Sequence, residues 1–335
     1  MKTKREITRL VIGLTISTVL VVAAFRYLNF WNIWDIIRSA KPAILFAAAG
    51  LLFCGYFMRS VRWWLMLRGG SERPPSVGIT GAVLLAGFAA NNVLPFRAGD
   101  ILRATYFSRR LRTSPSFLFG TLVLERALDL LSLLTLCVVI LPYTRLDAIY
   151  PEILKVTIGA AICGVAGLSM LLLFGAQVQG LLQRLLLKII GEGPRARKVN
   201  ESIEQLLKPF CNMSLSMAAQ LSVLSIAVWS FEGLMYLAVA KALGIGLGML
   251  VDLSAMVMAN FVTMIPSAPG YVGTFHAAVI AVLKIAGASN DKAAAFAVCA
   301  HAMLWLPITI AGGIAFLVIR EPKQTSVLPQ EAGTQ

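Results

Sequence analysis

The chain has 335 residues, of which 58% are hydrophobic and only 14% are charged, and its mean hydropathy is +0.78. A soluble domain of this length needs more charge to cover its surface, so the composition excludes one and indicates an integral membrane protein. The formal net charge of +14 fits basic cytoplasmic loops that face anionic lipid. Because no aromatic-interleaved basic module accompanies it, we expect no nucleic-acid partner.

The N-terminal segment resembles a secretory signal, because basic residues precede the apolar stretch 10–25. That stretch is long for a signal core and Arg26 follows it directly, so we expect an uncleaved first helix, with cleavage as the alternative. Residues 1–320 are predicted to form a single transmembrane domain. Residues 321–335 are predicted to be a polar, disordered cytoplasmic tail.

The remaining apolar runs predict helices. Several are long enough for the roughly 20 residues that a helix needs to cross a bilayer, and none alternates as a barrel strand does. We therefore expect an all-α polytopic membrane protein. The runs cover 42–57, 77–95, 116–141, 153–175, 215–243, 250–265, 274–289 and 293–319.

The distribution of arginine predicts that 77–95 does not cross the membrane. A basic loop at 59–73 is expected in the cytoplasm, so a crossing would place the arginines at 97–112 outside, against the positive-inside rule. The run is instead expected to enter from the cytoplasm, break and return. The break is predicted at Asn92, Pro95 and Gly99, because proline removes a backbone donor and glycine permits positive φ.

A second, opposed hairpin is predicted at 250–289, entering from the outside. Its break falls at Asn260, Pro266, Pro269 and Gly270, and the loop 176–213 is expected in the cytoplasm. The result is about six spanning helices plus two opposed re-entrant hairpins arranged as an inverted repeat, with both termini cytoplasmic. Such repeats place a site near the bilayer midplane, between broken helices.

Three ionisable residues lie near the centre of the 116–141 helix: Glu125, Arg126 and Asp129. A central Asp, Lys or Arg costs roughly 2.5–3.5 kcal/mol on insertion scales, so these residues need compensation. Arg126 and Asp129 lie three positions apart and can neutralise each other. The group is a candidate translocation site, and the alternative is an internal ion pair that fixes helix packing.

Glu232 occupies a similar position in the 215–243 helix. Ser222, Ser225, Trp229, Glu232 and Tyr236 are spaced so as to share one stripe of that helix. A polar stripe faces either a cavity or a partner helix to which it hydrogen-bonds.

Arg97, Asp100 and Arg103 mark the mouth of the first hairpin. Arginine binds phosphate through two parallel donors, so the mouth is a candidate headgroup site; a basic collar that anchors the hairpin is the alternative. His276 is either satisfied by a backbone carbonyl or part of a proton relay. With two histidines and five scattered cysteines, we expect no metal and no cofactor.

The segments "NNVLPFRAGDILRA", "LERALDL" and "PSAPGYVGTFHAAV" resemble, in this order, the lysylphosphatidylglycerol synthase transmembrane-domain, or flippase-like, family. The resemblance covers roughly residues 10–320, adds Gly273 to the second break, and implies lipid handling between the leaflets of a bacterial inner membrane. Tyr271 and His276 stand where many relatives have glycine and glutamate. This form is similar to the branch associated with hopanoid synthesis.

The resulting hypothesis is a lipid flippase or transporter whose lipid is a phospholipid, polyprenyl-linked or hopanoid-type molecule. No nucleotide-binding Gly-x-x-x-x-Gly-Lys loop is present, so movement is expected to be downhill or coupled to an ion. Two alternatives are a membrane-embedded transferase acting on a lipid phosphate and a non-catalytic partner of lipid-biosynthesis enzymes. Membrane lipids are the expected partners, and the oligomeric state is left open.

Overall fold

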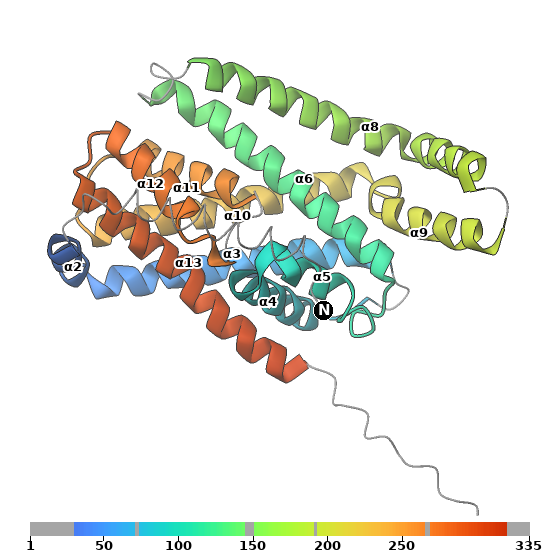
Figure 1. Ribbon diagram of the computed structural model, residues 1–335, viewed down its shortest axis with the longest axis horizontal. Coiled ribbons are helices and arrows are strands. Elements are labelled where there is room, and N and C mark those ends of the chain that lie inside the picture. The colour runs from blue at the N-terminus through green and yellow to red at the C-terminus, as the bar shows by residue number, and fades with distance from the viewer. Residues whose placement is uncertain (1–29, 71–73, 145–150, 191–192, 265–268, 320–335) are drawn as a thin grey trace, which may run out of the picture.

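The computed structural model describes residues 30–70, 74–144, 151–190, 193–264 and 269–319, and within these ranges the fold is helical without strands. The predicted all-helical architecture is thereby confirmed. The expected first helix at 10–25, the tail 321–335 and Pro266 lie outside the described residues. Figure 1 shows an elongated bundle whose long helices run side by side.

The N-terminal half contains two long helices and a helical hairpin. The short helix α2 (Phe30–Arg38) leads into α3 (Pro42–Arg68), and Ser76 caps α4 (Val77–Val93) by accepting from the backbone amide of Ile79. A 3₁₀ turn, η1 (Pro95–Arg97), separates α4 from the short helix α5 (Ala98–Ala104). The helix α6 (Pro115–Ile140) follows, with a second 3₁₀ turn, η2 (Leu141–Tyr143), at its end.

The helix α8 (Pro151–Ile190) is a 40-residue helix that departs from helical geometry at Phe174, where φ is −122°. It is followed by the amphipathic helix α9 (Pro194–Cys211). Together they make most of the segment 176–213 helical, so the expectation of a loop there was wrong, while its cytoplasmic location stays a prediction. The apolar run ends near residue 175, but no proline or paired glycine follows before Gly191, so the helix continues.

The C-terminal half repeats the pattern of a long helix followed by a helical hairpin. The helix α10 (Leu215–Ala242) precedes α11 (Met249–Met264), and a 3₁₀ turn, η3 (Pro269–Tyr271), separates α11 from α12 (Thr274–Ile285). The final described helix is α13 (Asn290–Ile319). By length and composition, α3, α10 and α13 can cross a membrane, while α4, α11 and α12 are shorter apolar helices.

In each hairpin the second helix packs back against the first. An ideal Cβ on Gly99 of α5 would lie 1.9 Å from the carbonyl oxygen of Gly87 in α4, so the two backbones touch through glycine. In Figure 1 the α4–α5 hairpin lies toward the end where α6 begins, and the α11–α12 hairpin lies toward the end that carries α2. The η1 and η3 turns contact each other, so the two breaks meet inside the bundle.

Candidate functional site

The buried charges lie between two hydrophobic clusters. In α3, Leu52 belongs to one cluster and Trp63 to the other. The buried residues Arg59 and Arg62 lie between these two positions along the helix. In α6, Leu128 belongs to the second cluster and Leu133 to the first, so the change from one cluster to the other falls beside the charged residues 125–129. The molecule therefore has two apolar cores separated by a charged layer, which is where the two breaks also meet.

One half of this layer joins α3, α6 and α10. The guanidinium of Arg59 lies 2.9 Å from Glu232 and 3.6 Å from Asp129, and its carbon sits 4.9 Å from the centre of the Trp229 ring. Arg62 donates at 2.8 Å to both Asp129 and the hydroxyl of Ser225. Each buried carboxylate thus faces an arginine from a different helix, which compensates its loss of hydration.

The other half joins α5 to α6. Arg103 is fully buried and donates through both terminal nitrogens to Glu125, at 2.8 and 3.3 Å. Its guanidinium lies 4.0 Å from the centre of the Trp63 ring. A planar, paired contact of this kind is the strongest arrangement for a buried arginine and carboxylate. Arg103 therefore lies inside the bundle, paired with Glu125, and not at an open mouth.

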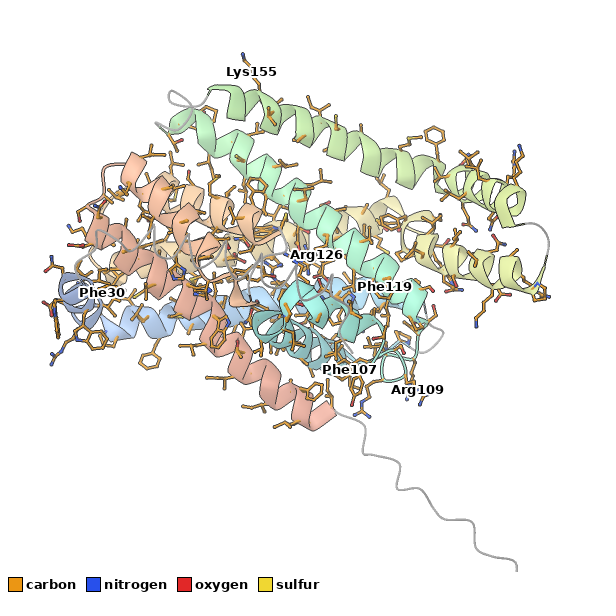
Figure 2. The ribbon with its side chains drawn as sticks, in the orientation of Figure 1. Phe30, Phe107, Arg109, Phe119, Arg126 and Lys155 are labelled. Carbon is orange, nitrogen blue, oxygen red and sulfur yellow. The ribbon has the colours of Figure 1, made fainter. Side chains whose placement is uncertain are left out.

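Arg126 connects the two halves. It lies within 3.4–3.7 Å of Asp100, Glu125 and Asp129, and its side chain retains 29% of its exposure. Figure 2 shows Arg126 on α6 near the middle of the molecule, whereas Arg109 lies at its periphery. The connected group among the described residues comprises five arginines and four carboxylates, an excess of one positive charge: Arg59, Arg62, Arg97, Arg103, Arg126, Asp100, Glu125, Asp129 and Glu232.

The two helix breaks share an unusual backbone feature. Each is a 3₁₀ turn that begins with proline and ends with a non-glycine residue at positive φ, Arg97 at 53° and Tyr271 at 57°. Such residues persist only where the surroundings fix them. Arg97 is fixed across the bundle, because its Nη2 donates at 2.7 Å to the carbonyl oxygen of Thr263 at the end of α11.

A cavity of about 130 Å³ lies where the breaks meet. Its charged lining consists of Arg59, Arg97 and Arg126 against Asp129 and Glu232, so cations exceed anions there. Four atoms on its lining residues are buried and make no hydrogen bond with any described residue: Nε of Arg97, Nε of Arg126, Nε1 of Trp229 and Oδ1 of Asn91. Buried polar atoms normally have partners, so the cavity is suited to water or a polar ligand.

The predicted site residues separate into three places. Those that line the cavity are Asn92, Arg97, Arg126, Asp129, Glu232, Asn260 and Gly270. Asp100, Arg103 and Glu125 belong to the charged layer outside the cavity lining. His276 lies in a neighbouring groove, with its ring centre 4.8 Å from that of His301, and does not line the cavity.

The predicted break residues occupy the turns themselves. Pro95 and Pro269 begin η1 and η3, Gly99 contacts α4, and Gly273, at φ 93°, directly precedes α12. The Nδ2 of Asn260 donates at 2.7 Å to Glu232. Of the predicted polar stripe on α10, Ser225, Trp229, Glu232 and Tyr236 are buried, whereas Ser222 is exposed.

Arg59 and Arg62 were missed. We expected them in a cytoplasmic loop at 59–73, and this was wrong, because α3 continues to Arg68 and buries both side chains. The signal was present: no glycine or proline interrupts the sequence between Gly55 and Gly69, and the two arginines are three residues apart on one helix face. Within the described ranges no cluster of His, Cys, Asp and Glu is able to hold a metal ion.

Comparison with known protein families gives a match over most of the chain. The sequence profile described as "Lysylphosphatidylglycerol synthase TM region" matches residues 10–312. The chain belongs to this family. Two breaks and a buried charged layer therefore lie in a lysylphosphatidylglycerol synthase transmembrane region, and the protein is a membrane protein.

The chain is also similar to individual archaeal proteins. A glycosyltransferase named AglD from Haloferax volcanii is 24% identical over 357 residues, covering 98% of this chain and 57% of AglD. UPF0104 membrane proteins of Methanocaldococcus jannaschii and Methanothermobacter thermautotrophicus are 24% and 25% identical, covering 70% and 89% of this chain and 97% and 92% of those proteins. This chain thus spans little more than half the length of AglD.

Proposed function

We propose that this protein moves a lipid between membrane leaflets by admitting its anionic headgroup to the cavity between the two helix breaks. In this proposal the α4–α5 and α11–α12 hairpins are re-entrant, enter from opposite sides and form an inverted repeat with about six spanning helices. Both termini are cytoplasmic, and the membrane is the bacterial inner membrane. The hydrocarbon chains of the lipid stay in the bilayer while the headgroup crosses.

The observation that carries this proposal is the cavity with its excess of arginine. Arg97 and Arg126 each have a buried Nε–H that makes no hydrogen bond with a described residue, and a phosphate oxygen is a strong acceptor for such donors. The Oδ1 of Asn91 needs a donor instead. A headgroup that combines a phosphate with a hydroxyl or amine supplies both, which supports a phospholipid over a purely apolar lipid.

The size of the cavity limits what it holds in this conformation. About 130 Å³ accommodates a few water molecules, or a phosphate group, but not a whole lipid. Entry of a headgroup therefore requires the two hairpins to separate. The contacts between the breaks are suited to such a change, because short turns absorb backbone rotation more readily than continuous helices do.

AglD, which is named a glycosyltransferase, favours a second candidate function: transfer of a group to or from a lipid phosphate. Within the described residues, however, all four carboxylates of the charged layer pair with arginine, so none is available as a general base in this conformation. Incubation of the purified protein with radiolabelled lipid phosphate and sugar donors distinguishes the two. A labelled product would establish the transferase.

Leaflet exchange of a fluorescent anionic phospholipid in reconstituted vesicles tests the proposed function. Arg126→Gln and Glu232→Gln should each slow exchange roughly tenfold or more, which is the effect of losing one charged hydrogen bond. The matched control is Arg197→Gln, because Arg197 forms an exposed pair with Glu201 on α9, far in sequence from the cavity. Wild-type rates in both cavity variants would refute the proposal.

A further inference from the structure

An apolar groove lies beside the polar cavity. Its volume is about 600 Å³, and its walls include Val93 at the end of α4, Val272 after η3 and Leu306 on α13. These three side chains retain 56%, 44% and 48% of their exposure, so the groove opens to the surroundings of the bundle. In a membrane protein those surroundings are lipid.

The groove and the cavity are neighbours. Four residues line both spaces: Asn92, Gly270, His301 and Trp305. The indole Nε1 of Trp305 donates to the carbonyl oxygen of Asn92 at 3.3 Å, and Nε2 of His301 lies 2.7 Å from the carbonyl oxygen of Gly270. His301 and Trp305 both lie on α13, so this helix lines both spaces.

The partition is closed by a small set of hydrogen bonds. The Nδ2 of Asn92 donates at 2.9 Å to Thr309 on α13, and an ideal Cβ on Gly270 would come within 3.0 Å of the Trp305 indole nitrogen. Gly270 adopts φ 67°, so its identity permits both the turn and the close approach of the indole. The Trp305 indole therefore stands on the boundary that the polar cavity and the apolar groove share.

We infer that the groove binds a hydrocarbon chain of the same lipid whose anionic headgroup occupies the cavity, and that Trp305 is the gate between them. This inference rests on the proposed function. The occupant follows from the continuity of a cation-rich cavity with an apolar groove. An amphiphile with an anionic head is the ligand that satisfies both at once.

Photo-crosslinking tests the inference in vesicles that contain the full chain. The probes are phosphatidylglycerol and phosphatidylcholine, each with a diazirine in one acyl chain, and labelled residues are located by mass spectrometry. Labelling of Val272 and Leu306 should be stronger with the anionic probe and should fall in Arg126→Gln. The internal control is Ile314, an exposed apolar residue of α13 outside the groove. Its labelling should depend neither on the headgroup of the probe nor on the Arg126→Gln substitution.

A second variant tests the gate. Trp305→Phe keeps an aromatic ring but removes the indole donor, and should increase groove labelling by roughly two- to tenfold, the effect of one hydrogen bond. The matched control is Trp64→Phe, because Trp64 also donates to a backbone carbonyl, that of Pro75, away from the groove. Unchanged labelling in Trp305→Phe, with Ile314 labelled normally, overturns the assignment of the gate.

Leaflet exchange is measured in the same vesicles, so the two proposals fail separately. If leaflet exchange proceeds but both probes label the groove equally, the groove does not bind the chain of the transported lipid, and the proposed function stands. Headgroup-dependent groove labelling without exchange refutes transport and leaves a lipid-binding site. Labelling of the groove that matches Ile314 in every comparison identifies it as ordinary lipid-facing surface.

Discussion

At the scale of single residues, Arg103 and Glu125 form one of the two most enclosed ion pairs of the charged layer, with side chains 0% and 3% exposed. Desolvation of two charges offsets much of their attraction, so the pair contributes little net stability compared with apolar residues of the same volume. Removing one partner alone is different, because the buried charge that remains keeps only a longer contact, Glu125 with Arg126 at 3.4 Å or Arg103 with Asp100 at 3.8 Å. The pair is therefore expected to behave as a unit.

Single substitutions of this pair should each be costly. Arg103→Met or Glu125→Leu should each lower the free energy of unfolding by about 3–5 kcal/mol, because the remaining partner keeps only a longer contact, with Arg126 or Asp100. The double variant Arg103→Met/Glu125→Leu should recover much of this loss. A double-mutant cycle measured by reversible unfolding in detergent checks the result, and additive losses would contradict the pairing.

The sequence predicted one side of the charged layer and missed the other. Glu125, Arg126, Asp129 and Glu232 were found because they interrupt apolar helices, where an ionisable residue is costly. Their partners Arg59 and Arg62 were missed because arginine at the end of an apolar run is also typical of a membrane interface. Only the three-dimensional pairing shows which arginines are buried.

At the scale of elements, close helix contacts depend on glycine. Gly99 brings α5 against Gly87 of α4, and Gly312 brings α13 against α4, where an ideal Cβ would lie 2.1 Å from the carbonyl oxygen of Leu85. In membranes, small residues at interfaces allow the backbones to approach closely. The first hairpin is therefore held on both sides by contacts that admit no side chain.

Substitution of Gly99 should open the first hairpin. Gly99→Ala forces α4 and α5 apart and should destabilise the protein by about 1–3 kcal/mol, as overpacking does. Gly50→Ala is the matched control, because Gly50 is also helical but a Cβ there meets no atom within 4 Å. That variant should be neutral or slightly stabilising. Thermal unfolding of both in detergent compares them, and equal stability would argue against the contact.

The helix ends could be predicted in part. The apolar run 116–141 corresponds closely to α6. The proline and glycine residues correctly predicted the positions of the η1 and η3 turns. The lengths of α3 and α8 were underestimated, because hydropathy reports where a helix meets lipid and not where its backbone hydrogen bonds end. Both helices continue beyond their apolar runs as polar or amphipathic segments.

At the scale of the whole molecule, the charged layer separates two apolar cores, and the proposed topology places it at mid-depth of the bilayer. The hairpin tips then meet at the same level from opposite sides. The turn with Arg109 and Arg110 would face the cytoplasm, and the turn between α10 and α11 would face the opposite side. This arrangement is what alternate opening of a midplane site requires.

Thiol labelling in intact cells tests the proposed topology. In a cysteine-free background, Gly246→Cys should react with a membrane-impermeant maleimide in intact cells, because Gly246 lies in the exposed turn between α10 and α11. Arg110→Cys should react only after permeabilisation. Labelling of both positions from the same side would contradict the opposed hairpins.

The central claim is that the two hairpins must separate for a headgroup to cross. A crosslinker with two methanethiosulfonate groups forms reducible disulfides with Val93→Cys and Val272→Cys in a cysteine-free background, and ties the end of α4 to the segment after η3 without altering the residues of the cavity. Leaflet exchange of an anionic phospholipid should stop when the link is formed and return when it is reduced. Exchange at the same rate before and after reduction would contradict the claim.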